Sequence, residues 1–262
     1  MAVRILVTFA LENEFAPWRA SHDFKPAKLG DADVYVADFG SAQLTVALTG
    51  VGARQAALNS SQIMRGEFDA FDCWISSGLA GGLQSNYAIG EVLAARSVFS
   101  EAVPADGTSR LIQCSGALVS FAADSGAKIV EQFYSADHVI STAREKRALS
   151  AKADAVEMES FEILRAARSA GVPAVAIRAI SDTLDQDLPI DMAEILTDEG
   201  HVSIPRVLGQ VALKPRSLPG LVRLGKNSRA ATQSLSRFLD AYITALANRT
   251  APLETKLTAG AF

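Results

Sequence analysis

Two stretches of the chain decide its fold, AVEMES at residues 155–160 and VAIRAISD at residues 175–182. Each is an apolar run that stops abruptly at charged side chains, and one helical segment separates them. Side chains at the carboxyl end of a strand in an open α/β sheet face the crevice where such folds bind ligands. The two stretches therefore predict buried strands that carry two glutamates, an arginine and an aspartate to a functional site.

Length and composition indicate a soluble globular protein with a large core. The chain has 262 residues, of which 49% are hydrophobic and 21% charged, which is too apolar for a disordered protein. We expect one α/β domain over residues 1–248, in which residues 190–248 form a mostly helical extension. Residues 249–262 are predicted to be a flexible tail.

Charge and the amino-terminal sequence limit the partners of the chain. The formal net charge is -4, and no block of lysine and arginine is long enough to predict binding to nucleic acid or a membrane surface. The opening apolar run, VRILV at residues 3–7, leads to Glu12 and Glu14 and not to a cleavage site, so it is predicted as a first strand. We expect a cytoplasmic protein without an integral membrane segment that binds a small molecule and no nucleic acid.

Cysteines, histidines and glycines argue against a metal or a nucleotide cofactor. Cys73 and Cys114 lie far apart without a CxxC motif, which predicts buried thiols, and the three histidines lack metal-ligand spacing. The glycine-rich stretches 50–52 and 78–82 could bring backbone N–H groups to a ligand, or they could be simple chain reversals. Neither matches GxGxxG or GxxxxGK[ST], which disfavours a dinucleotide-dependent oxidoreductase. We predict no metal and no cofactor, with water or phosphate as co-substrate.

Periodicity and turn residues predict alternating strands and helices. The predicted strands are 4–9, 34–39, 44–49, 72–77, 153–156 and 174–180, and the predicted helices are 12–20, 53–64, 158–170, 204–213 and 221–247, the last after a bend at 214–219. Ser141 or Thr142 is the expected N-cap of another helix. The stretch 78–82 is predicted as a turn, and the segments 91–98, 118–120 and 128–130 as short strands or strand–helix pieces. Strands 153–156 and 174–180 with the helix between them form a predicted βαβ unit.

Glu157 and Glu159 flank Met158 at a junction between strand and helix. One interpretation is that these carboxylates only stabilise the amino terminus of the helix. The other is that one of them binds two neighbouring hydroxyls, because an ionised carboxylate offers two acceptor oxygens. Ribose carries such a diol, so the second interpretation points to a nucleoside.

Asp182 ends an otherwise apolar strand directly after Ser181. Burial at this point would let its carboxyl group deliver a proton to a leaving group near neutral pH. The alternative is that Asp182 only caps a turn or a helix. Arg178, four residues earlier, could be a structural ion-pair partner of Glu157 or Glu159.

Five motifs, in order over residues 1 to about 190, resemble the nucleoside phosphorylase superfamily. They are ALENEF at 10–15, GVG at 50–52, SGLAGGL at 77–83, VEMES at 156–160 and RAISD at 178–182. They are most similar to its methylthioadenosine/S-adenosylhomocysteine nucleosidase branch. The resemblance implies a three-layer αβα fold with a central mixed twisted sheet and a C-terminal helical extension. It also implies a homo-oligomer with sites near the subunit contacts.

The resemblance implies a role for the residues of the last two motifs. Glu159 would hold the ribose hydroxyls with support from Glu157, and Met158 would pack beneath the sugar. Asp182 would protonate the purine at N7, helped by Ser181.

Further roles follow from the same resemblance. Arg178 would steady the ribose side of the site, and Glu14 would act on the attacking water. Gly78 and Leu79 would lie near this water, although the family tends to have a hydroxyl residue where Leu79 stands. Backbone groups of Val139 and Ile140 would contact the base, in a place where nucleosidases usually have an aromatic side chain.

The chemistry that the resemblance implies is cleavage of an N-glycosidic bond. Such cleavage needs a proton on the leaving base and negative charge near the cationic sugar. Phosphorylases of the family carry a Gly-Asp-Pro-x-Arg type loop near the start, whereas this chain has Glu12 and Glu14, which would repel phosphate. We therefore predict hydrolysis of a 5′-substituted adenosine to release adenine. The alternatives are a phosphate-dependent nucleoside phosphorylase and a non-catalytic nucleoside-binding protein.

A closer similarity concerns the substituent on the sugar. DHVIST at 137–142, the VEMES form, LP at 188–189 and KPRSLP at 214–219 resemble the hopanoid-biosynthesis-associated members, which are linked to release of adenine from adenosylhopane. A lipid at the ribose 5′ position would need an apolar channel. Phe9, Leu79 and the C-terminal helices are the candidate linings.

Overall fold

The central element of the fold is β11 (Ala174–Asp182), a strand in which all nine residues are buried. It pairs in parallel with β5 (Cys73–Ser76) and β6 (Leu79–Gly82), and in antiparallel with β7 (Val92–Phe99). Its small and β-branched apolar residues fill both faces, as in strands that are covered on two sides. Arg178 and Asp182 are the two charged residues in this strand, so their position inside the protein needs partners.

The computed structural model describes residues 2–65, 71–102, 109–189 and 215–248, together with positions 107, 194, 197, 203, 205, 206, 209 and 210. The remaining strands are β1 (Val3–Phe9), β2 (Lys25–Leu29), β3 (Ala32–Phe39), β4 (Ala42–Leu48), β8 (Leu111–Gln113), β9 (Lys128–Ser135) and β10 (Ala155–Glu157). The helices are α1 (Glu12–Ser21), α2 (Ala53–Arg65), α3 (Gly116–Asp124), α4 (Ala143–Leu149), α5 (Ser160–Ser169), the 3-10 helix η2 (Pro215–Ser217) and α8 (Leu218–Ala247).

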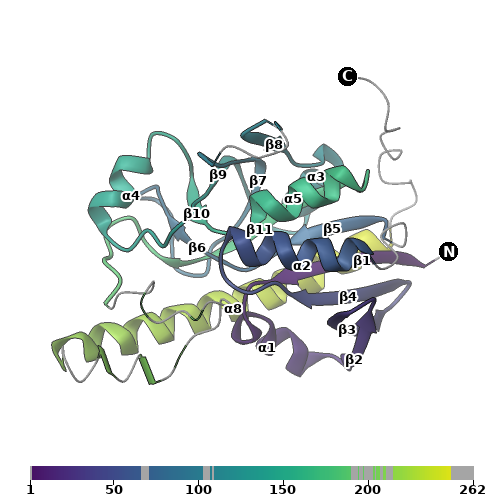
Figure 1. The fold of residues 1–262 in the computed structure, drawn as a ribbon, viewed down its shortest axis with the longest axis horizontal. Coiled ribbons are helices and arrows are strands. Elements are labelled where there is room, and N and C mark those ends of the chain that lie inside the picture. Colours follow the sequence, from purple (N-terminus) through teal and green to yellow (C-terminus); the bar gives the residue numbers. More distant parts are fainter. Residues whose placement is uncertain are drawn as a thin grey trace.

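The strands form one mixed sheet with helices on both of its faces (Figure 1). The order is β2-β3-β4-β1-β5-β11-β6-β10-β9-β7-β8, and the additional pairing of β11 with β7 closes the second half of the sheet into a ring. Helices α2 and α5 pack together on one face, and α1 packs against α8 on the other. The predicted αβα layers and the mixed sheet are confirmed.

Strands with continuous apolar character were predicted correctly from the sequence. The strands predicted at 4–9, 34–39, 44–49, 72–77, 153–156 and 174–180 correspond to β1, β3, β4, β5, β10 and β11. The predicted helices 12–20, 53–64, 158–170 and 221–247 correspond to α1, α2, α5 and α8. Thr142 is the N-cap of α4, because its Oγ1 accepts from the amide of Glu145 at 3.2 Å.

The predicted βαβ unit is wrong. Strand β10 runs antiparallel to β6, and β6 runs parallel to β11, so β10 and β11 run in opposite directions with β6 between them. The turn expected at 78–82 is also wrong, because residues Leu79–Gly82 form strand β6. Its glycines were misleading, because they mark close packing: a Cβ at Gly81 would lie 3.0 Å from Asp182 Oδ2 and 3.2 Å from Val156 Cγ1.

Three further segments differ from the predictions. Residues 118–120 lie inside helix α3, whose buried side is formed by Leu118, Val119 and Ala122. Residues 92–98 and 128–130 belong to the longer strands β7 and β9, and Glu91 directly precedes β7. Strand β2 was not predicted, because its sequence KPAKL is short, contains a proline and two lysines, and lies at the edge of the sheet.

Some predictions are not tested by this structure. The helix predicted at 204–213 falls largely outside the described residues, and the tail predicted at 249–262 falls wholly outside them. The single domain over residues 1–248 stays a prediction. No helix in the described part of the chain is both long and apolar enough to cross a bilayer.

The second half of α8 is part of the core, whereas its first turns are exposed. Leu239 is fully buried and Leu218 is 52% exposed on the same helix. We expect Leu239→Ala to lower the free energy of unfolding by about 2–5 kcal/mol, because it leaves a cavity. The control Leu218→Ala should change it by less than about 0.5 kcal/mol. Denaturant unfolding measures both, and equal losses would contradict this division of the helix.

Candidate active site

A buried ion pair joins the two stretches that were singled out in the sequence. Arg178 of β11 is 1% exposed, and its Nη2 donates to Glu157 Oε2 at 2.7 Å and to Ser76 Oγ at 3.2 Å. Its Nη1 donates to the carbonyl oxygen of Ile177 at 3.1 Å. The structural ion pair that the sequence left open is therefore formed, with Glu157 as the closer partner.

Glu157 also stabilises the start of α5. Its Oε2 accepts from the amide of Glu159 at 3.0 Å and from the amide of Ser160 at 2.7 Å. The helix-terminus interpretation thus holds for this glutamate. Among the described residues, Glu157 Oε1 and Arg178 Nε are buried atoms without a hydrogen-bond partner. Glu157 is placed to hold Glu159 and Arg178. One acceptor atom of Glu157 and one donor atom of Arg178 remain without a hydrogen bond.

Glu159 is held by a different element, the turn between β4 and α2. Its Oε1 accepts from the amide of Gly52 at 2.8 Å, and its Oε2 lies 3.7 Å from Arg178 Nη2. Gly52 has φ 93°, a conformation that favours glycine, and so can present its amide at this point. The predicted role of the GVG stretch, backbone N–H groups close to a site, is consistent with this contact.

Burial makes Glu159 unusually basic for a carboxylate. Burial, the largest cause, and the nearby charge of Glu157 together raise the pKa of Glu159 from 4.5 to about 8, against the opposing charge of Arg178. Burial likewise raises the pKa of Glu14, again opposed by Arg178. Buried acids around one cation are the kind of arrangement that active sites use to hold carboxyl groups near their titration point.

Glu14, in the first turn of α1, reaches across to the start of β6. Its Oε2 accepts from the amides of Ala10 at 3.0 Å and Leu11 at 3.2 Å, and its Oε1 accepts from Leu79 at 3.3 Å. A Cβ at Gly78 would lie 3.3 Å from Glu14 Oε2, so Gly78 lies directly against this carboxyl group.

Glu12 does not accompany Glu14 into this region. It forms an ion pair with Arg19 at 2.6 Å, and both side chains are 43% exposed. The expectation that two acids face the site near the start of the chain is therefore wrong for Glu12. Both residues lie in the first turn of α1, and residues two apart point to different sides of a helix.

Asp182 ends β11 and is bound on both of its carboxylate oxygens. Oδ1 accepts from Ser181 Oγ at 2.7 Å, and Oδ2 forms an ion pair with Nζ of Lys146 from α4. The expected pairing of Ser181 with Asp182 is thus present. Lys146 is fully buried and was not predicted from the sequence. It lies four residues after the N-cap Thr142 in the polar helix α4, and no apolar periodicity there predicts that its side chain points inward.

Strand β6 connects the two charged groups. Glu14 is bonded to the amide of Leu79, and Asp182 lies against Gly81, two residues further along the same strand. At about 3.3 Å per residue, these positions are roughly 7 Å apart. Glu14 and Asp182 therefore contact neighbouring positions on the same strand.

The predicted base-contact residues border this region. Ile140 is buried in a small apolar cluster with Leu83, Tyr134 and Val156, and Met158 packs against the same cluster. Met158 Cε also lies 3.7 Å from the point where a Cβ of Gly52 would stand. Val139 is half-buried beside Ile140 in the segment between β9 and α4.

Two of the proposed channel linings can be placed. Phe9 is 1% exposed and packs against Phe15 and Trp18, so it is a core residue and does not line a channel. Helix α8 approaches the site beside Asp182, where the two border a small cavity lined by Asp182, Gln186, Asp187, Leu188, Pro189, Gly220, Arg223, Leu224 and Asn227.

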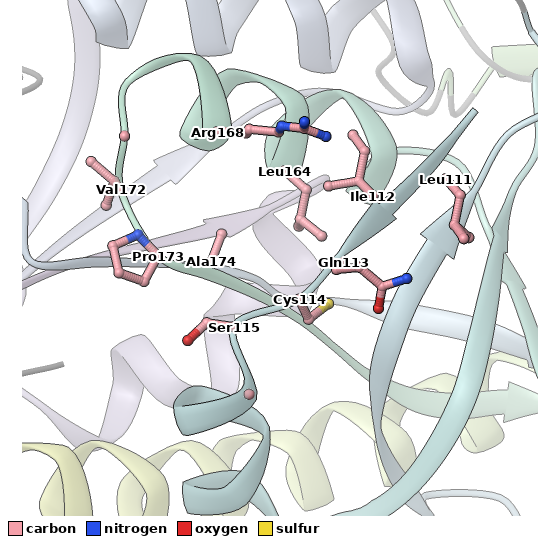
Figure 2. Close-up of a pocket in the computed structure, with 12 residues that line it drawn as sticks. Leu111, Ile112, Gln113, Cys114, Ser115, Leu164, Arg168, Val172, Pro173 and Ala174 are labelled. Carbon is pink, nitrogen blue, oxygen red and sulfur yellow. The ribbon is translucent and has the colours of Figure 1, made fainter. Parts of the chain in front are cut away.

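A larger cavity lies at the opposite end of β11. It has a volume of about 390 Å³ (Figure 2) and is lined by Leu111, Ile112, Gln113, Cys114, Ser115, Gly116, Leu164, Arg168, Gly171, Val172, Pro173 and Ala174. Ala174 and Asp182 are the two ends of β11, roughly 25 Å apart at about 3.3 Å per residue. Burial raises the pKa of the Cys114 thiol to about 12, which makes it a poor nucleophile. The predicted site residue Asp182 is at the other end of this strand.

His22 and the two cysteines take structural roles. His22 pairs with Asp240 at 2.7 Å, while Cys73 and Cys114 are buried thiols, as predicted. His201 lies outside the described residues. Over the described part of the chain, no three His, Cys, Asp or Glu side chains gather in a way that could hold a metal ion.

The raised pKa of Glu159 predicts a pH-dependent stability. A carboxyl whose folded pKa is about 8 stabilises the fold fully below its ordinary value of 4.5, and this contribution is lost as the pH rises through 8. The midpoint of thermal unfolding should therefore fall between about pH 5 and about pH 9, and Glu159→Gln should reduce this fall. Parallel loss of stability in both proteins would contradict the assignment.

Comparison with known sequences agrees with these motifs. A family model described as Phosphorylase superfamily matches residues 4–202. The 5′-methylthioadenosine/S-adenosylhomocysteine nucleosidase of Actinobacillus succinogenes is 29% identical over 205 residues, which cover 71% of this chain and 87% of the relative.

Solved structures show the same fold. The 5′-methylthioadenosine/S-adenosylhomocysteine nucleosidase of Helicobacter pylori, complexed with a substituted pyrrolidin-3-ol, matches with a TM-score of 0.70 at 19% identity over 93% of this chain and 98% of that chain. The Neisseria meningitidis nucleosidase in complex with methylthio-immucillin-A matches with a TM-score of 0.69 at 22% identity, over 92% and 99% of the two chains. Native futalosine hydrolase of H. pylori matches with a TM-score of 0.70 at 18% identity, over 93% and 98%. The chain therefore belongs to the phosphorylase superfamily of enzymes, and its fold is the one found in the methylthioadenosine/S-adenosylhomocysteine nucleosidases.

Proposed function

We propose that this enzyme hydrolyses the N-glycosidic bond of a 5′-substituted adenosine and releases adenine. The observation that carries hydrolysis over phosphorolysis is the position of Glu14. Its carboxyl group accepts hydrogen bonds from the amides of Ala10, Leu11 and Leu79. Backbone amides of this kind could otherwise bind an anion. A co-substrate phosphate would have to displace this acid, whereas a water molecule can be bound by it.

The roles of the charged residues follow from the chemistry of the bond. Glu159 would accept the ribose hydroxyls, with Glu157 and Arg178 fixing it. Glu14 would take a proton from water, a step that its raised pKa favours because a stronger conjugate base accepts protons more readily. Asp182 would give its proton to the purine at N7.

The reaction balances with one water molecule. Asp182 passes its proton to N7 as the bond between N9 and C1′ breaks, and the bonding electron pair stays on the base. Water adds to C1′ and gives a proton to Glu14. The products are neutral adenine and the free sugar, and exchange with solvent returns the proton from Glu14 to Asp182. Those carboxyl groups of the site that are ionised in the transition state would stabilise the cationic sugar.

The 5′-substituent is proposed from the relatives. The named relatives act on methylthioadenosine, adenosylhomocysteine or futalosine, and the similarity to hopanoid-associated members adds adenosylhopane. Because Phe9 is a core residue, Leu79 and the C-terminal helices remain as candidate linings of a channel for a lipid. The predicted homo-oligomer and cytoplasmic location stay predictions.

The proposed function is tested by base release. We expect the pure protein to release adenine from methylthioadenosine, adenosylhomocysteine or adenosylhopane without added phosphate, at a rate that phosphate does not increase. Adenosine, inosine and futalosine complete the set of substrates. Strict dependence on phosphate would assign a phosphorylase, and calorimetric binding without release would assign a nucleoside-binding protein.

Replacement of the proposed acid should affect turnover and not folding. We expect Asp182→Asn to lower kcat by about 10²–10⁴-fold, because the base would then leave without its proton. Its KM should change far less. Ser169→Ala, at an exposed position near the end of α5, serves as a control that should retain full activity. Normal turnover of the Asp182 variant would remove this residue from the mechanism.

A further inference from the structure

Lys146 is a buried cation whose hydrogen bonds all lead to the proposed acid and the loop that follows it. The side chain is fully buried, and Nζ contacts Asp182 Oδ2, the carbonyl of Thr183 at 3.0 Å and the carbonyl of Gln186 at 2.9 Å. An ammonium group has three protons to donate, and here all three have an acceptor. The cation is therefore held in one position relative to Asp182.

Helix α4 is anchored so that this position is fixed. The amide of Thr142 donates to Glu145 Oε2 at 2.9 Å, which completes the capping box. The amide of Ala143 donates to Asp187 Oδ1 at 2.7 Å, and the amide of Leu188 donates to the carbonyl of Ser141 at 2.7 Å. The start of α4 and the loop after β11 thus hold each other on either side of Lys146.

Strand β6 leaves room for the pair at one glycine. A Cβ at Gly81 would lie 3.0 Å from Asp182 Oδ2 and 3.5 Å from Lys146 Cε. Any larger residue would push the carboxylate away from the ammonium group. The close contact between Asp182 and Lys146 is therefore supported from the sheet as well as from α4.

We propose that Lys146 is a positioning residue that strengthens Asp182 as an acid, an inference that rests on the proposed function. When Asp182 gives its proton to N7, negative charge appears on its carboxylate. A preorganised cation beside that carboxylate stabilises the charge as it develops, which lowers the barrier to proton transfer. The ion pair in the structure is the state of Asp182 after its proton has left, and the proton is regained from solvent before the next turnover.

Within the part of the chain that the structure describes, four other charged residues lie near the pair. Arg223 of α8 and Asp187 of the loop border the same small cavity as Asp182, and they carry opposite charge. Gly81 of β6 and Val156 of β10 contribute no charge. Arg147 and Asp185 form an exposed pair beside the loop. Lys146 is therefore the cation bonded directly to the acid.

The test compares three substitutions at this position. Lys146→Gln keeps hydrogen-bonding capacity without charge, Lys146→Met removes both, and Lys146→Arg keeps the charge. We expect the Gln and Met variants to lose about 10²-fold in kcat with a much smaller change in KM. Lys152→Met is the matched control, because Lys152 is a half-exposed lysine bonded to Glu101 at 2.8 Å, and it should retain full activity.

The pH profile separates this role from a structural one. A residue that acts on the proton transfer from Asp182 also acts on the pH dependence of kcat. Removal of the charge should therefore move the alkaline limb of kcat to higher pH in the Gln and Met variants. The Arg variant should keep the limb near that of the natural enzyme. Thermal unfolding of each variant confirms that it is folded, and the Gln and Arg variants allow the comparison if the Met variant is not.

Two results would overturn the inference. If the Gln variant keeps the kcat and the alkaline limb of the natural enzyme, Lys146 does not act on Asp182. If the folded Gln and Arg variants lose activity equally with no movement of the limb, Lys146 only holds the loop. Absence of base release by the natural enzyme from every nucleoside is a different outcome, since it would remove the proposed function together with this role.

Discussion

The buried ion pair between Arg178 and Glu157 is the interaction on which the site depends. It joins the middle of β11 to the end of β10, two strands that are not neighbours in the sheet and that run in opposite directions. Loss of one partner of such a pair typically costs about 3–5 kcal/mol, because the other charge stays buried alone. The same glutamate holds the first amides of α5, so the position of Glu159 depends on this pair as well.

The other buried acids of the site fall into two groups that differ in their cationic partner. Glu14 and Glu159 share one guanidinium, and burial raises the pKa of both. Asp182 instead has a buried ammonium group of its own. Strand β6 sets the distance between the groups, and its glycine lets Asp182 approach closely.

Much of the site could be predicted because its residues follow apolar strands. Glu157, Glu159, Arg178 and Asp182 end or interrupt runs that can only be buried, so their partners had to be charged or polar groups in the interior. Lys146 could not be predicted in this way. It lies in a short polar helix, where the side of the helix that faces inward depends on the loop after β11 and not on local periodicity. Likewise, nothing in the local sequence distinguishes Glu12 from Glu14. Only the packing of α1 shows that Glu14 points inward and Glu12 does not.

The sequence by itself determined the strands β1, β3, β4, β5, β10 and β11, the long helices and the residues at the ends of β10 and β11, because hydrophobic periodicity and charge placement are local signals. Tertiary structure decided the direction of β10, the strand character of residues 79–82 and the ring closed by β7. These features depend on pairing between segments far apart in the chain, and a glycine-rich stretch has no local signal for the neighbours it will have. The partner of Asp182 was decided in the same way, since only the folded chain brings α4 to the end of β11.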